Sequence, residues 1–181
     1  MESRPLLHSD RDGRAAVSEL FAGARLDSVL YRQSGSGGLG GVPNGMIHEV
    51  DLDVLLVLSG VAVRVTWERE DYVEGLAIAA VEDSAPADGL IDVAAERSAQ
   101  WAALIGRQVS RVAFSWQVSE ADCPASLFSL RISFYDGSNV VVALGELNAE
   151  GVPTYHPDSL LVIFDELSAR EYHPSFLLGG A

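Results

Sequence analysis

Alternation of apolar and polar positions marks the clearest element of the chain, a β-hairpin. Leu130, Ile132 and Phe134 alternate with polar or aromatic residues, which predicts a strand with one buried face. Asp136-Gly137 interrupts this run, and an Asp-Gly pair is favoured where both central residues of a hairpin turn take positive φ. The alternation resumes over residues 139–144, which predicts the returning strand.

Other apolar patterns predict two helices and several further strands. Spacing of three to four residues predicts helices over 13–21 and 92–105, and Gly23 and Gly106 are placed to end them. Ser59-Gly60 is a second tight hairpin turn. The remaining strands are predicted over residues 26–32, 46–58, 61–68, 72–81, 109–116 and 160–164.

The predicted elements follow the same order twice. Residues 20–31 match residues 103–114 when Gly23 is aligned with Gly106, and the two hairpin turns then fall in corresponding places. We therefore predict an α+β fold, mainly antiparallel β, in which two tandem helix-strand-hairpin-strand repeats pack as one pseudo-symmetric body. The alternative is that β-rich stretches look alike through alternation alone. The predicted organisation is a single domain over 1–181, with an N-terminal tail (1–12), repeat units near 14–83 and 97–167, and an inter-repeat linker (84–91).

Charge narrows the range of partners. The chain has a formal net charge of −14, and its 12 basic residues are all arginine. This balance argues against direct contact with nucleic acid or with an anionic membrane surface, and it suits a basic partner or simple solubility. No apolar run approaches the roughly 20 residues that cross a bilayer. Residues 1–12 lack the apolar segment of a signal peptide, so we expect a cytoplasmic protein.

Acidic residues recur in the predicted strand over 46–58. Glu49, Asp51 and Asp53 alternate with apolar residues, which places three carboxylates on one face of a straight strand. Such a strand spreads them about 6–7 Å apart, whereas Ca²⁺ or Mg²⁺ is usually held by a loop that wraps the ion. We therefore expect no metal here, but a solvated face or a docking surface for a basic partner, extended by Glu68 and Glu70.

The alternative functional site lies around the last predicted strand. Tyr-His-Pro occurs on both sides of it, and the strand ends at Asp165. A small-molecule-binding or hydrolytic site between the repeats would use Tyr155, His156, Asp165 and His173. Proline after each histidine favours structural turns over a site.

Other motifs that signal chemistry are missing from the chain. Cys123 is the single cysteine, which rules out an internal disulfide and a cysteine-based zinc site. The glycine-rich segment 34–41 lacks the Gly-Lys-Ser/Thr of a phosphate-binding loop, and no Gly-x-Ser-x-Gly is present. We predict no catalytic residue, metal or cofactor, and we do not expect an enzyme.

These observations favour a non-enzymatic protein-interaction module that binds a basic partner protein. Small acidic bacterial immunity proteins, which neutralise basic toxins, are similar to this chain in size and charge, although no motif carries that similarity. A homodimer formed through strand edges is a further alternative.

Overall fold

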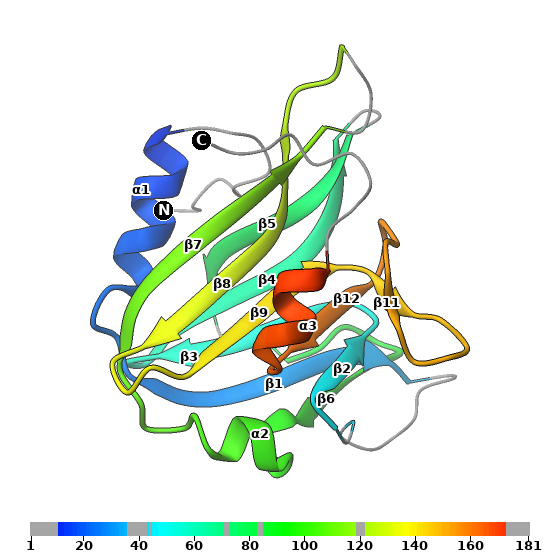
Figure 1. The fold of residues 1–181 in the computed structure, drawn as a ribbon. Helices are drawn as coiled ribbons and strands as arrows, with labels where there is room; N and C mark the ends of the chain where they lie inside the picture. Colours follow the sequence, from blue (N-terminus) through cyan, green and yellow to red (C-terminus); the bar gives the residue numbers. More distant parts are fainter. Residues whose placement is uncertain are drawn as a thin grey trace.

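The structure is a computed structural model that describes residues 11–35, 43, 45–70, 73–82, 85–118 and 122–172 (Figure 1). Antiparallel sheets with few helices make up the described chain, which confirms the predicted mainly antiparallel β class. No described helix is long and apolar enough to cross a membrane. The helices are α1 (Arg11–Phe21), the 3-10 helix η1 (Ala95–Arg97), α2 (Ala99–Ala102) and α3 (Glu166–Glu171).

Sheet 1 has five antiparallel strands in the order β5-β4-β3-β1-β6. Strands β3, β4 and β5 are consecutive in sequence and in space, as expected for short hairpin connections. Ser59 (φ 49°) and Gly60 (φ 82°) give the β3–β4 turn positive φ at both central residues, which matches the twist of paired strands. The strands are β1 (Leu26–Ser34), β3 (Asp53–Leu58), β4 (Val61–Glu70), β5 (Val73–Val81) and β6 (Leu90–Ala94).

Sheet 2 also has five antiparallel strands, in the order β2-β12-β9-β8-β7. Strands β8, β9 and β12 are buried along nearly their whole length; β9 and β12 are almost continuous apolar runs, whereas the polar positions of β8 are mostly buried serines. A separate two-stranded ribbon joins β10 (Glu146–Leu147) to β11 (Pro153–Thr154). The strands of sheet 2 are β2 (Ile47–Val50), β7 (Val109–Gln117), β8 (Ser126–Phe134), β9 (Asn139–Leu144) and β12 (Leu160–Ile163).

The two sheets share one hydrophobic core, with β5 packed against β8. Alternation along β1 buries Val29, Tyr31 and Gln33. Helix α1 lies beside β7 in Figure 1 and buries Val17 and Phe21 against β7 and β5. Two sheets that bury their inner faces against one another therefore form the body.

The segments that lead into β1 and β7 are hydrogen-bonded to one another. Gly23 (φ 68°) and Gly106 (φ 81°) have the same left-handed backbone after their helices. An isolated antiparallel bridge joins Arg25 to Gln108. The hydrogen bonds beside this bridge occur in pairs, in which the two segments exchange the roles of donor and acceptor. In the first pair, Gly23 N donates to Val109 O (3.1 Å) and Gly106 N donates to Leu26 O (2.7 Å). In the second pair, Leu26 N donates to Arg107 O (2.9 Å) and Val109 N donates to Ala24 O (2.8 Å).

The predicted single strand over 46–58 is wrong. The structure divides it into β2, which belongs to sheet 2, and β3, which belongs to sheet 1. Asp51 and Leu52 form the crossover between them. Strand β2 pairs with β12, far away in sequence, so the local alternation carried no sign of the break.

The predicted helix over 92–105 is wrong in its first part. Residues Leu90–Ala94 form β6, which pairs with β1, and only η1 and the four-residue α2 are helical. Arg32 of β1 donates two hydrogen bonds to the Asp92 carboxylate, at 2.8 and 2.9 Å. This long-range ion pair and the pairing with β1 stabilise residues 90–94 as a strand, although the local spacing of apolar residues favours a helix.

The predicted hairpin between β8 and β9 is present, but its turn differs from the prediction. Gly137 has φ 88°, whereas Asp136 does not have positive φ. Phe134 N donates to the Ser138 carbonyl at 2.9 Å, so the loop is longer than two residues. The Asp136 carboxylate accepts hydrogen bonds from the Ser138 backbone and hydroxyl, which supports this longer turn.

Candidate functional site

The predicted row of carboxylates does not lie on one strand face. Glu49 is exposed on β2 and Asp51 is exposed in the crossover, whereas Asp53, at the start of β3, is only 8% exposed. An Arg32 nitrogen lies 4.0 Å from the Asp53 carboxylate, and Arg32 also binds Asp92. Asp53 is therefore part of a half-buried ion network, and Glu49 and Asp51 are the members that face solvent.

Strand β4 braces the crossover from the other side. The Trp67 indole donates to the Asp51 carbonyl at 3.1 Å, and the Thr66 hydroxyl donates to the Leu52 carbonyl at 3.3 Å. Glu68 and Glu70 follow on the same strand, half-exposed and exposed respectively. We call Glu49, Asp51, Glu68 and Glu70 the acidic corner, since they lie along or next to this braced junction.

Arginine side chains offset part of the charge at the acidic corner. An Arg64 nitrogen lies 3.9 Å from the Glu68 carboxylate, and Arg69 lies 3.8 Å from Glu74. These contacts are long and half-exposed, so each stabilises the fold only weakly. Glu49 and Asp51 form no ion pair among the described side chains. The crossover therefore carries two exposed carboxylates, Glu49 and Asp51, on a braced backbone, and β4 adds the partly offset Glu68 and Glu70.

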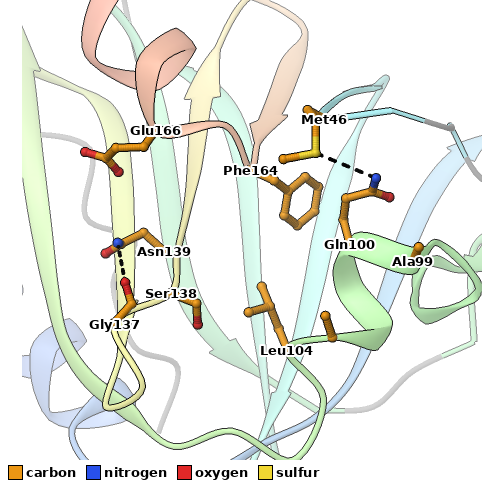
Figure 2. Close-up of a pocket in the computed structure, with 10 residues that line it drawn as sticks. Met46, Ala99, Gln100, Leu104, Gly137, Ser138, Asn139, Phe164 and Glu166 are labelled. Atoms are coloured by element: carbon orange, nitrogen blue, oxygen red, sulfur yellow. Dashed lines mark hydrogen bonds between the residues drawn. The ribbon is translucent and has the colours of Figure 1, made fainter.

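A groove of about 470 Å³ lies between α2 and the end of sheet 2 (Figure 2). Figure 2 shows Phe164 and Leu104 pointing into its middle, Met46 and Gln100 on one side, and Asn139 and Glu166 on the other. Its floor is apolar, and Met46 is 49% exposed. The volume falls in the range of small-ligand sites, whose specificity depends on a few available polar groups.

The polar groups that line the groove already have partners. The two Glu166 oxygens accept from Arg131 at 2.7 Å and from Arg170 at 2.8 Å. Both hydrogen bonds lower the pKa of Glu166, and the one from Arg131 has the larger effect. Asn139 Nδ2 donates to the Gly137 carbonyl at 3.0 Å. The groove therefore offers an apolar surface, on whose rim Glu166 and Asn139 are held by hydrogen bonds within the fold.

Behind Phe164 lies a buried polar chain that the sequence did not reveal. The Trp101 indole hydrogen-bonds to the Tyr31 hydroxyl, which lies 2.8 Å from His48 Nδ1. The exposed fraction is 0% for all three residues. Phe164 packs edge-on against both His48 and Trp101, with ring centroids 5.0 and 5.1 Å apart. The chain thus ties together β1, β2 and α2 inside the core.

Burial shifts the pKa values of Tyr31 and His48 in this hydrogen-bonded chain. It raises the pKa of Tyr31, and the hydrogen bond from Trp101 only partly opposes this effect. It lowers the pKa of His48, with a smaller opposing effect from the Gly45 backbone. His48 Nε2 forms no hydrogen bond of ordinary geometry among the described residues. Both groups are therefore neutral at pH 7.

Residues of the alternative histidine site have separate structural contacts. His156 Nδ1 contacts the Asp158 carboxylate, and its Nε2 lies 3.9 Å from Glu146. The Tyr155 hydroxyl accepts from Gln117 at 3.3 Å. Asp165 caps α3 by accepting from Ser168 N at 2.7 Å, whereas His173 lies outside the described residues.

Two other candidate features of the sequence are the single cysteine and a possible metal site. Cys123 is a free, half-exposed thiol. Within the described ranges, no three histidine, cysteine, aspartate or glutamate side chains come together as metal ligands. Most of the predicted glycine-rich segment lies outside those ranges.

Comparison of the chain with family models, curated proteins and solved structures gave no match.

Proposed function

We propose that the protein is a non-enzymatic interaction module that binds a basic partner protein through the acidic corner, in the manner of small acidic immunity proteins. The observation that carries the proposal is the position of four carboxylates, two at the braced crossover and two on the strand that braces it. Glu49 and Asp51 are exposed there and form no ion pair among the described side chains, and the protein as a whole has a charge of −14. Such a surface attracts a basic partner and raises the association rate.

The rigidity of the junction also supports this proposal. Trp67 and Thr66 hold the crossover backbone against β4, so little conformational entropy is lost there when a partner binds. The groove near Phe164 has an apolar floor, and Glu166 and Asn139 on its rim are held by hydrogen bonds within the fold. Asp165 is similarly committed to capping α3.

We also propose that the two halves of the chain are tandem repeats within one domain. Support comes from the order of the strands. In each half, four strands of one sheet lie side by side in the order in which they follow one another along the sequence: β1, β3, β4 and β5 in sheet 1, and β7, β8, β9 and β12 in sheet 2. The reciprocal hydrogen bonds around Gly23 and Gly106 agree with a two-fold relation. Under this proposal β2 and β6 are additions, one to each sheet, and the acidic corner belongs to the first half alone.

Affinity capture with charge-matched variants tests the proposed function. One variant replaces the acidic corner (Glu49, Asp51, Glu68 and Glu70) with serine. The control replaces four exposed carboxylates elsewhere: Glu19, Glu82, Asp88 and Glu150. Each variant has four fewer negative charges, so the overall charge change is the same.

A basic protein that is retained stoichiometrically by the native protein and by the control, but not by the acidic-corner variant, is the expected result. Retention by all three proteins, or a partner without a basic surface, would contradict the proposal. The captured protein is identified by mass spectrometry and its binding is then repeated with both components purified.

A further inference from the structure

We infer that the Trp101–Tyr31–His48 chain is an acid-sensitive latch, which holds β2 in the body while His48 is neutral and releases it when His48 is protonated. The inference concerns a conformational device and does not depend on the proposed partner. It rests on the direction of the hydrogen bonds, on the burial of all three side chains, and on the position of β2 at the edge of sheet 2.

Hydrogen-bond chemistry fixes the direction of the chain. An indole nitrogen can only donate, so Trp101 donates to the Tyr31 oxygen. The single Tyr31 hydroxyl hydrogen is then free to point at His48 Nδ1, 2.8 Å away. We assign His48 Nδ1 as the acceptor, because this tautomer gives the Tyr31 hydroxyl hydrogen a partner, and the neutral ring then carries its hydrogen on Nε2.

A second proton on His48 breaks this order. It occupies Nδ1, the atom to which the Tyr31 hydroxyl donates. The Tyr31 oxygen would then receive donors from both Trp101 and His48, while its own hydrogen would lose its acceptor. The imidazolium would also carry a charge at a site with an exposed fraction of 0%. Both effects oppose protonation in the closed structure.

The elements around His48 offer no described carboxylate to balance that charge. On β1, Tyr31 faces it, while Arg32 points to the opposite face and binds Asp92. On β2, Glu49 likewise alternates away and is exposed.

The helical segments do not supply a counter-charge either. From α2, Trp101 takes part in the buried hydrogen-bonded chain. In η1, which precedes α2, the Glu96 carboxylate accepts a hydrogen bond from Val29 N, and Arg97 is exposed. After β12, Phe164 packs on the imidazole, while the carboxylates that follow are occupied: Asp165 by Ser168, and Glu166 by Arg131 and Arg170.

Strand β2 is the element that opening would release. It has four residues and pairs on one side only, with β12. Phe164 N donates to the Met46 carbonyl just before β2, so Phe164 is linked to both β2 and the imidazole. Withdrawal of His48 therefore detaches β2 and uncovers one edge of β12, while β8 and β9 stay paired.

Linkage gives the size of the effect. In an open state His48 titrates near its ordinary value of about 6.5, whereas in the closed state its pKa is lower. If the closed state stays neutral, acidification from pH 7 to pH 5 raises the opening equilibrium by about 25-fold. Most carboxylates remain ionised at pH 5, so this window separates His48 from general acid denaturation.

Hydrogen exchange on the full chain tests the latch. Protection factors of the β2 amides, corrected for the intrinsic effect of pH, are expected to fall by up to about 25-fold between pH 7 and pH 5, while those of β8 and β9 stay constant. His48→Gln keeps an acceptor for Tyr31 but cannot titrate, so its β2 protection is expected to be independent of pH. His156→Gln, a change at a half-exposed histidine, is the matched control and should behave like the native protein.

A His48 imidazole titration followed by NMR in the native protein gives an independent readout. The expected midpoint lies clearly below 6.5. A midpoint at or above 6.5 would overturn the inference even if His48→Gln failed to fold. So would β2 protection that does not change with pH, or an equal fall in His48→Gln.

Discussion

Replacing Tyr31 with phenylalanine tests the buried hydrogen-bond chain most simply. The substitution keeps the ring, which is fully buried, and removes one oxygen. Trp101 Nε1 then loses its acceptor and His48 Nδ1 loses its donor. Each buried polar atom left unpaired costs about 1–3 kcal/mol, so the free energy of unfolding is expected to fall by about 2–6 kcal/mol.

Thermal and urea denaturation at pH 7.5 measure this loss. For a chain of this size, it corresponds to a decrease in Tm of roughly 4–24 °C. Tyr135→Phe is the matched control, because the Tyr135 side chain is 71% exposed and its loss is expected to stay within about 0.5 kcal/mol. A change of less than about 0.5 kcal/mol in Tyr31→Phe would refute the reasoning, since the two atoms would then have other partners.

Two further predictions concern the fold around α3. Gly145 has φ 151°, and an added Cβ would overlap the Tyr172 hydroxyl, so Gly145→Ala should lower the free energy of unfolding, measured by urea denaturation, by about 3 kcal/mol or more. Gly137 (φ 88°) faces open space, so the control Gly137→Ala should lower it by only about 1–2 kcal/mol, and equal losses would argue against the close approach at Gly145. Hydrogen bonds from Ser168 lower the pKa of Asp165, so its cap is present at neutral pH and is lost as the pH falls from the ordinary value of 3.8 through the lower folded value. Amide protection in α3 should fall in that window in the native protein and be low at all pH values in Asp165→Ala; undiminished protection in the variant would contradict the cap.

Local patterns predicted the elements whose determinants are close in sequence. The hairpin between β3 and β4 follows from alternation on both sides of Ser59-Gly60, and the ends of two helical regions follow from Gly23 and Gly106. In each case the residues that decide the conformation lie within a few positions of one another. Antiparallel pairing then follows from the short connections.

Sheet membership could not be predicted in the same way. Residues 46–58 alternate as one strand would, but Ile47–Val50 pairs with β12 and Asp53 turns toward Arg32. The continuous row of carboxylates was therefore an incorrect expectation, although Glu49 and Asp51 are exposed. Strand β6 was missed for the same reason, because its pairing with β1 is long-range.

The buried polar chain was also beyond the reach of sequence patterns. Tyr31 is separated from His48 by 17 positions and from Trp101 by 70 positions. Alternation along β1 does place Tyr31 on the buried face, which was the one available signal. Its partners come from β2 and α2, which the sequence placed within a longer strand and a longer helix, and local periodicity does not show that these elements meet β1.

Association kinetics with the captured partner test the central claim most directly. Stopped-flow rates are measured over a range of salt concentrations for the native protein, the acidic-corner variant and the charge-matched control. We predict that the acidic-corner variant associates about tenfold or more slowly at low salt and loses most of its salt dependence, while the control stays within about twofold of the native rate. Equal rates and equal salt dependence for the two variants would contradict the claim, because net charge alone would then account for binding.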